Sequence, residues 1–174
     1  MRTDCSAHAA MNPMTHYMEL LATNQPWQLL IFMAVPVICA ETLAISELIV
    51  LYTRKLDGLA RRVNRVTGIF AGLYFLGVFV YLLLNVVIPL TISGGWRGPG
   101  DVIAVGFYLS GVVPFLGMAS LELGIVGRKL DENGKLGLHA TFVGIFLVVA
   151  HIAMIFGMLD PSLFIAVPKA AMEM

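Results

Sequence analysis

Residues 66–92 read VTGIFAGLYFLGVFVYLLLNVVIPLTI and contain no charged side chain. An α-helix needs about 20 apolar residues to cross a bilayer, so this stretch predicts a membrane-spanning helix. Three other stretches are similarly long and almost as apolar: 27–53, 102–126 and 138–159. None of them alternates polar and apolar residues as a barrel strand does. The sequence therefore predicts an all-α membrane protein, a bundle of four transmembrane helices.

The composition of the chain of 174 residues supports this fold class. Hydrophobic residues make up 59% of the chain and charged residues 13%, whereas soluble domains have about 45–50% apolar and about 25% charged residues. The formal net charge is zero, so no overall field attracts an anionic partner. These values exclude a disordered protein and an ordinary soluble enzyme. We expect the lipid bilayer, and not nucleic acid, as the partner of this chain.

Basic residues between the predicted helices indicate their orientation. The second connection has Arg97 alone, whereas the first and third connections hold most of the others: Arg54, Lys55, Arg61, Arg62 and Arg65, then Arg128, Lys129 and Lys135. Loops rich in Lys and Arg remain in the cytoplasm, so we expect both termini on the outer side. Trp27 and Trp96 would then both lie at the outer interface, where indoles prefer to lie.

The predicted helices divide the chain into three parts. Residues 1–26 are expected to form an outer tail, in which Pro13 to Leu21 has apolar residues on one side and predicts a short interfacial helix. Residues 27–160 are expected to form the four-helix transmembrane domain. Residues 161–174 are expected to form a short tail on the outer side.

Two hairpins of this bundle resemble each other. The first helix leads into Arg54-Lys55-Leu56-Asp57 and the third into Arg128-Lys129-Leu130-Asp131, and a glutamate, Glu47 or Glu122, precedes each basic pair by six or seven residues. The similarity indicates a duplicated hairpin, although cytoplasmic helix ends also recruit Arg and Lys without duplication. If the repeat is real, Glu47 and Glu122 occupy equivalent positions.

Ionisable residues inside the predicted helices are the candidates for a functional site. A charged side chain at mid-bilayer costs about 2.5–3.5 kcal/mol on insertion scales. At 1.5 Å per residue, Glu47, Glu122 and His139 fall within about 10 Å of the cytoplasmic edge, and Glu41 and His151 about 18–20 Å above it. Glu41 and Glu47 also point about 120° apart around their helix. We therefore expect two levels, Glu47 with Glu122 and His139, and Glu41 with His151.

The first hypothesis is a metal-binding or redox protein, linked to quinone or to a respiratory complex. Carboxylate and imidazole ligands suit iron, manganese or zinc, and helix bundles build such sites from facing side chains. The candidate ligands are Glu41, His151, Glu47, Glu122 and His139. The Glu-x-x-His pattern of ferritin-like bundles is absent. The alternative without metal chemistry is that protonated glutamates hydrogen-bond between helices, while His151 pairs with a backbone or hydroxyl group.

Two further cofactors remain open. Haem b would use His139 or His151 as an axial ligand, with a methionine or glutamate opposite, because the other three helices contain no histidine. Gly68, Gly72 and Gly77 would make room for the macrocycle, although such glycines more often serve close helix packing. Copper(I) would use thioethers and an imidazole near the outer side. The residues available for it are Met11, Met14, His16, Met18, Met154 and Met158.

Transport is a different class of function. Glu41, Asn85 and Ser110 are polar positions that, with helix breaks at Pro36 and Pro114, would line a path for protons or a cation. Four helices are few for a transporter, so this hypothesis expects a homo-oligomer. A third class is a non-catalytic accessory subunit of a larger membrane complex.

A resemblance covers most of the chain, from Met14 to Pro161. The motifs that carry it are Asn24-Gln25-Pro26-Trp27, Ala40-Glu41-Thr42-Leu43 and Gly95-Trp96-Arg97-Gly98. With these the chain resembles a family of small bacterial four-span proteins, sometimes labelled permease, that has no assigned function. The resemblance implies a multi-pass protein of the bacterial inner (cytoplasmic) membrane and carries no catalytic residue across. Dihaem four-helix cytochromes are of similar size, but this chain lacks their histidines on facing helices.

Overall fold

The computed structural model describes residues 14–55 and 57–160, and these residues form helices and connections without a strand. Four helical spans are long and apolar enough to cross a membrane: Trp27–Thr53, Leu59–Ser93, Pro99–Glu122 and Glu132–Met158. The prediction of an all-α, four-span membrane protein is therefore confirmed. Residues 1–13 of the expected N-terminal tail, and all of the expected C-terminal tail at residues 161–174, lie outside the described residues.

Two spans begin earlier than the hydropathy predicts. Helix α4 (Leu59–Leu82) starts at Leu59 and not at Val66, so the arginine-rich segment after Gly58 is helical. Helix α8 (Glu132–Met158) starts at Glu132, where the Asp131 carboxylate accepts the Gly134 amide at 2.9 Å and caps the helix. Hydropathy reports only the apolar part of a helix, and both helices include a polar segment before it.

The first span is irregular in its outer half because of Pro36. It consists of α2 (Trp27–Leu29), a π-helical turn η1 (Leu30–Ala34) and α3 (Val35–Thr53). Proline has no N–H, so the carbonyls four and five residues before Pro36, those of Phe32 and Ile31, lose their helical donor. The Tyr108 hydroxyl donates to the Phe32 carbonyl, and the Tyr74 hydroxyl donates to the Ile31 carbonyl at 2.9 Å. Two neighbouring spans thus satisfy the backbone that the proline frees.

Prolines also interrupt the second and third spans. In the second span, α4 passes through a π-helical turn η2 (Leu83–Val87) into α5 (Ile88–Ser93), which contains Pro89. In the third span, α6 (Pro99–Ser110) and α7 (Val112–Glu122) meet at Gly111, three residues before Pro114. The expected helix breaks are therefore present, and they lie in each case close to a proline.

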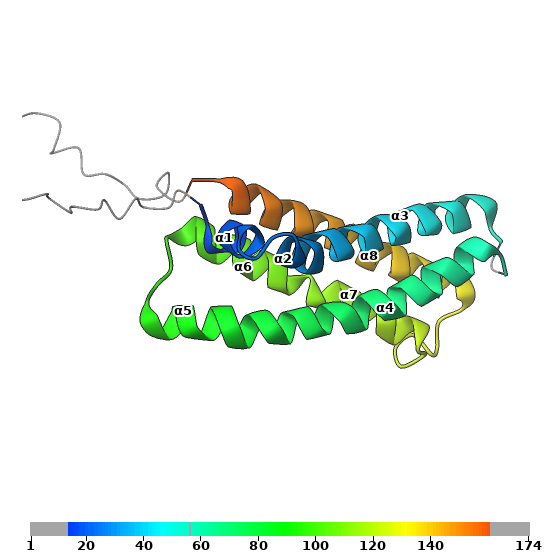
Figure 1. The fold of residues 1–174 in the computed structure, drawn as a ribbon. Coiled ribbons are helices and arrows are strands. Elements are labelled where there is room, and N and C mark those ends of the chain that lie inside the picture. The colour runs from blue at the N-terminus through cyan, green and yellow to red at the C-terminus, as the bar shows by residue number, and fades with distance from the viewer. Residues whose placement is uncertain (1–13, 56, 161–174) are drawn as a thin grey trace, which may run out of the picture.

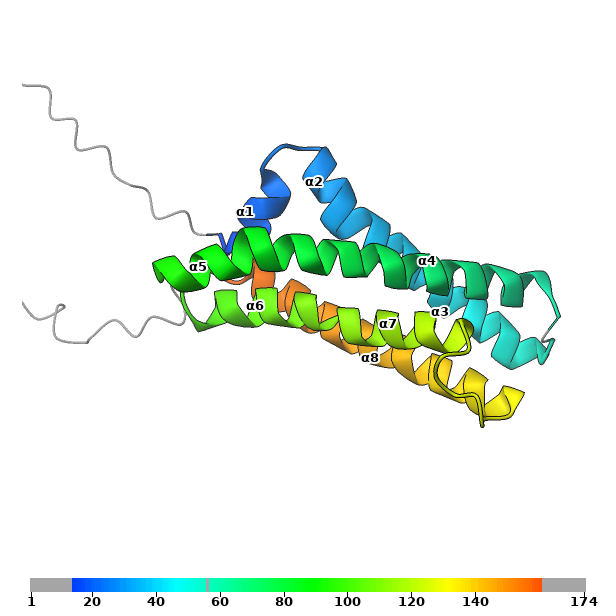
Figure 2. The ribbon, with the colours of Figure 1, turned by 90° about the horizontal axis from the view of Figure 1, so that it is seen from below.

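The spans form one elongated bundle (Figures 1 and 2). Helix α4 packs against α3 and α7, and α8 packs against α6 and α7. The described chain ends, near residues 14 and 160, lie at one end of the bundle, which we call the terminal end. The end of α3 at Thr53 and the start of α4 at Leu59 lie at the other end, together with the connection 123–131, and we call this the loop end. The two ends of the described chain therefore lie at the same end of the bundle.

The short helix expected before the first span is α1 (His16–Ala22). It contacts α6 and α8 at the terminal end, where Tyr17 and Leu21 enter a buried apolar cluster with Phe32 and Leu109. A second cluster fills the middle of the bundle and includes Leu43, Phe75, Phe115, Met118 and Phe146. Large apolar side chains such as Ile38, Ile45 and Leu48 remain exposed on the outside, which suits contact with lipid.

Candidate functional site

Near the loop end, all four spans contribute polar side chains to one cluster, which we call the inner network. Its members are Ser46 and Glu47 on α3, Arg61 and Asn64 on α4, Glu122 on α7, and His139 on α8. All of them are buried except Arg61, which is partly buried. The structure thus groups three of the predicted site residues, Glu47, Glu122 and His139, at the level where their sequence positions placed them.

His139 lies at the centre of the inner network and is 1% exposed. Its Nδ1 atom is 2.7 Å from Glu47 Oε2, and its Nε2 atom is 3.8 Å from Glu122 Oε1. The imidazole therefore lies between two carboxylates, one from each of the two similar hairpins. Neither ring nitrogen is in line for a hydrogen bond, so these contacts are electrostatic at the observed geometry. Gly68 lies beside the ring, since a Cβ there would be in ordinary contact with Nε2 at 3.5 Å.

The Glu47 carboxylate has only neutral donors besides His139. The Asn64 amide donates to Glu47 Oε2 at 2.8 Å and to the Ser46 hydroxyl at 3.1 Å. Glu47 Oε1 is buried without a hydrogen-bond partner. A buried carboxylate oxygen without a partner is costly, so this atom marks a place where a proton or another donor would be held.

The Glu122 carboxylate is paired with an arginine that the sequence analysis placed in a connection. The Arg61 guanidinium donates through Nη1 to Oε1 and through Nη2 to Oε2, the latter at 3.1 Å. Arg65 Nε lies 3.9 Å from Oε2, but its side chain is 62% exposed. Arg61 reaches this buried glutamate because α4 begins at Leu59 and not at the predicted Val66. Arg61, Asn64, Arg65 and Gly68 follow the i, i+3, i+4, i+7 spacing of one helix face, a signal that could have revealed this.

The inner network does not fit a metal ion as it stands. Ligands of one ion must converge on a point, whereas the two nitrogens of His139 face two different carboxylates and Arg61 binds both oxygens of Glu122. Within residues 14–55 and 57–160, no three His, Cys, Asp or Glu side chains group as metal ligands. Iron, manganese, zinc and copper binding therefore stay predictions without a preformed ligand set, and so does haem b.

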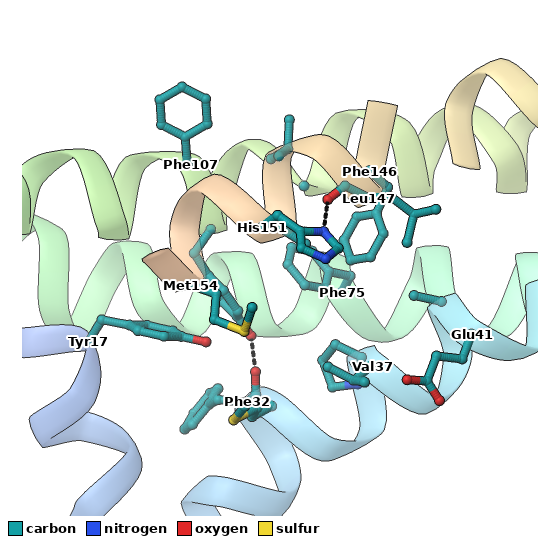
Figure 3. Close-up of a pocket in the computed structure, with 17 residues that line it drawn as sticks. Tyr17, Phe32, Val37, Glu41, Phe75, Phe107, Phe146, Leu147, His151 and Met154 are labelled. Atoms are coloured by element: carbon teal, nitrogen blue, oxygen red, sulfur yellow. Dashed lines mark hydrogen bonds between the residues drawn. The ribbon is translucent and has the colours of Figure 1, made fainter. Parts of the chain in front are cut away.

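The second predicted level lies in a cavity of the terminal half (Figure 3). The cavity has a volume of about 260 Å³ and is lined by residues of α1, the first span, α4, α6 and α8, among them Glu41 and His151. Glu41 comes from α3 and His151 from α8, on opposite walls. Both side chains line the cavity, but they make no ion pair or hydrogen bond with each other in the described part of the chain. Both are exposed, so the cavity reaches the bundle surface between these two helices.

The other residues of the predicted transport path lie elsewhere. Asn85 is exposed and donates to the Tyr81 carbonyl at 2.8 Å. Ser110 is exposed and donates to the Phe107 carbonyl at 2.7 Å. Neither lines the cavity. The structure therefore does not bring Glu41, Asn85 and Ser110 together, because the second and third spans turn these two side chains outward.

A buried contact that the sequence analysis missed attaches α1 to the third span. Asp101 is fully buried, and its carboxylate accepts the His16 amide at 2.7 Å and lies 2.6 Å from His16 Nδ1. The Arg97 amide donates to the same carboxylate at 3.3 Å, and the Arg97 guanidinium donates to the Met14 carbonyl at 2.6 Å. The Thr15 hydroxyl donates to the Gly157 carbonyl at 2.6 Å. Together these bonds fix α1 over the cavity, where Tyr17 forms part of the wall.

Comparison with known proteins identifies a family but no activity. A model for a family of unknown function, DUF6803, matches residues 11–173. The resemblance to a family without an assigned function is thereby confirmed. No curated protein and no solved structure matches the chain.

Proposed function

We propose that this chain, which belongs to the family of unknown function DUF6803, is a membrane transporter of protons that holds the transported proton in the inner network. The observation that carries the proposal is the position of His139 between two buried carboxylates, with both ring nitrogens and Glu47 Oε1 lacking a hydrogen bond. Buried polar atoms without a hydrogen bond are rare in proteins, and they mark groups that exchange a hydrogen-bond partner or a proton.

The charges of the inner network support one exchangeable proton. Glu122 is balanced by the bidentate guanidinium of Arg61. Glu47 has no such cation, and an unpaired charge in a buried site is strongly disfavoured. Neutrality therefore requires a proton either on His139, next to the Glu47 carboxylate, or on Glu47 itself. The two atoms are 2.7 Å apart, so a rotation of the imidazole ring would align them for transfer of the proton.

The arrangement along the bundle also suits transport. Leu43, Phe75, Phe115 and Met118 are almost fully buried and separate the inner network from the cavity. Glu41 and His151 in the cavity supply a second pair of groups that can carry a proton. Two polar levels with an apolar layer between them prevent a continuous water path and require proton transfer to be gated.

We propose further that the loop end faces the cytoplasm of a bacterial inner membrane. The basic residues of the first and third connections support this orientation. The arginine on Glu122 disfavours a metal ion at that carboxylate, so the metal-binding hypothesis loses weight, whereas the electron-transport and accessory-subunit hypotheses stay predictions. A homo-oligomer stays a prediction.

Proton flux into liposomes tests the proposal. The purified protein is reconstituted into vesicles that contain a pH-sensitive dye, and a potassium gradient with valinomycin drives protons inward. We expect acidification faster than in protein-free vesicles. Glu47→Gln abolishes the flux, because glutamine retains the Asn64 contact but carries no exchangeable carboxyl proton.

Glu132→Gln is the matched control, because Glu132 is an exposed residue whose partner is Lys135 at 2.8 Å. This variant retains the flux of the unchanged protein. The proposal is overturned if the unchanged protein leaves the vesicles as tight as protein-free ones, or if Glu47→Gln conducts normally. Elemental analysis of the same sample decides the metal hypothesis, which would require stoichiometric iron, manganese or zinc.

A further inference from the structure

The cavity of the terminal half has walls that are mostly apolar and aromatic. Tyr17, Phe32, Phe75, Tyr108 and Phe146 all line it. Figure 3 shows the imidazole of His151 within this group of rings, with Glu41 on the opposite wall. Since the cavity lies at the depth of the membrane-spanning helices and opens between α3 and α8, its ligand would enter from the lipid. Such a ligand must have an apolar body.

The Glu41 carboxylate requires a partner that the described chain does not supply. It is exposed on a membrane-spanning helix, beside the exposed apolar residues Ile38 and Ile45. No residue described by the structure forms an ion pair or hydrogen bond with it. Carboxylates inside a membrane pair with a cation or take up a proton. A positively charged group of a ligand would provide the missing partner.

The other polar atoms of the cavity are mainly hydrogen-bond acceptors. His151 Nδ1 lies 2.6 Å from the Leu147 carbonyl and donates to it, so the Nε2 atom of the neutral ring accepts. The Tyr108 hydroxyl uses its hydrogen on the Phe32 carbonyl and retains accepting capacity. Burial raises the pKa of Tyr17 to about 12, so its hydroxyl remains neutral and is the one group of these three that both donates and accepts. The site therefore favours a ligand that donates hydrogen bonds.

These observations select one class of ligand. A fatty acid would place a second carboxylate beside Glu41, and like charges repel. A quinone offers acceptors, which the acceptors of His151 and Tyr108 do not satisfy. A protonated amine offers N–H donors and a positive charge, and aromatic faces attract such cations. We propose that this cavity binds an amphiphilic organic amine, with its ammonium group at Glu41 and His151 and its apolar part among the aromatic rings.

The proposal shares Glu41 and His151 with the proton-transport proposal, but its test measures binding of a ligand and not proton flux. Binding is measured on the purified chain in nonionic-detergent micelles, by scintillation proximity with radiolabelled decylamine. Decanol and decanoate of the same chain length serve as neutral and anionic competitors. We expect saturable binding of decylamine that unlabelled decylamine displaces and that decanoate does not.

Two variants locate the site. Glu41→Gln keeps the size of the side chain and is expected to weaken decylamine binding by about tenfold or more, because glutamine has no negative charge with which the ammonium group can pair. Glu132→Gln, near the loop end, is the control and binds as the unchanged protein does. Ala150→Leu, which fills the cavity without changing a charge, is expected to reduce binding as well.

The proposal is overturned if decanol and decanoate compete as well as decylamine, since micelle partition would then explain the signal. The proposal is also overturned if Glu41→Gln binds decylamine normally. The third contradicting result is that the unchanged protein does not bind decylamine, as when a second copy of the chain covers Glu41. Loss of decylamine binding with intact proton flux would refute this inference alone. Normal decylamine binding without proton flux would refute only the proton-transport proposal.

Discussion

His139 Nδ1 lies 2.7 Å from Glu47 Oε2, and the two residues are 1% and 3% exposed. This contact joins the fourth span to the first at the loop end. On its other side the same imidazole faces Glu122, which Arg61 pairs in a bidentate manner. Ionisable side chains of all four spans are thus linked around one ring, directly or through Glu122, and a change at any of them alters the charge balance of the others.

The two arginines near Glu122 are expected to differ in their contribution to stability. Arg61→Met leaves a buried carboxylate without its close partner and should lower the free energy of unfolding by about 3–5 kcal/mol. Arg65→Met removes an exposed side chain whose Nε atom lies 3.9 Å from Glu122 Oε2. This variant should change the free energy of unfolding by about 0–1 kcal/mol. Thermal unfolding of both variants in the same nonionic detergent measures the difference. Equal losses would contradict the assignment of Arg61 as the partner of Glu122.

Two glycines of the second span are expected to respond differently to alanine. A Cβ at Gly72 would lie 2.5 Å from the Ala119 Cβ and 2.8 Å from the Phe115 carbonyl oxygen. Gly72→Ala therefore forces α4 and α7 apart, at a cost of about 1–3 kcal/mol. Gly77→Ala meets no atom within 4 Å and should unfold at the temperature of the unchanged protein or slightly above it. A stable Gly72→Ala variant would show that the two helices do not pack as closely as observed.

The attachment of α1 is expected to depend on Asp101. Asp101→Asn provides one acceptor oxygen where the carboxylate provides two, so it cannot satisfy both the His16 amide and the Arg97 amide. We expect amide hydrogen exchange in His16–Ala22 to accelerate by about tenfold, which corresponds to a loss of about 1.4 kcal/mol. Asp57→Asn, at an exposed position near the loop end, is the control. Unchanged exchange in α1 would mean that Thr15 and Arg97 hold the helix without Asp101.

The proposed orientation is tested by cysteine labelling in whole cells. In a chain whose Cys5 and Cys39 are replaced by serine and alanine, Ser93→Cys and Lys129→Cys each place one exposed thiol in the second or third connection. A membrane-impermeant maleimide should label the cysteine at position 93 in intact cells and the one at position 129 only after permeabilisation. The opposite pattern would invert the topology and place the inner network near the outer surface.

Part of the candidate site was predictable from the sequence, and part was not. The depths of Glu47, Glu122 and His139 follow from counting residues along the helices. The structure accordingly places these three residues at one level of the bundle. The partner of Glu122 was not predictable from hydropathy, since Arg61 belongs to a polar segment that hydropathy reads as a connection. The path through Asn85 and Ser110 failed for a related reason. Composition places a polar residue within a span, but it does not say toward which neighbour the residue points.

The sequence by itself determined that this chain crosses the membrane four times and which of its residues carry charge into the spans. Both are local properties, because the length and hydropathy of each segment by itself decide whether that segment can cross the bilayer. Only the tertiary structure decided that His139 lies between Glu47 and Glu122, and that Tyr108 satisfies the carbonyl freed by Pro36. These contacts depend on the rotation and register of each helix against its neighbours. Close packing of side chains and glycines sets that rotation, and residues far apart in the sequence establish it together.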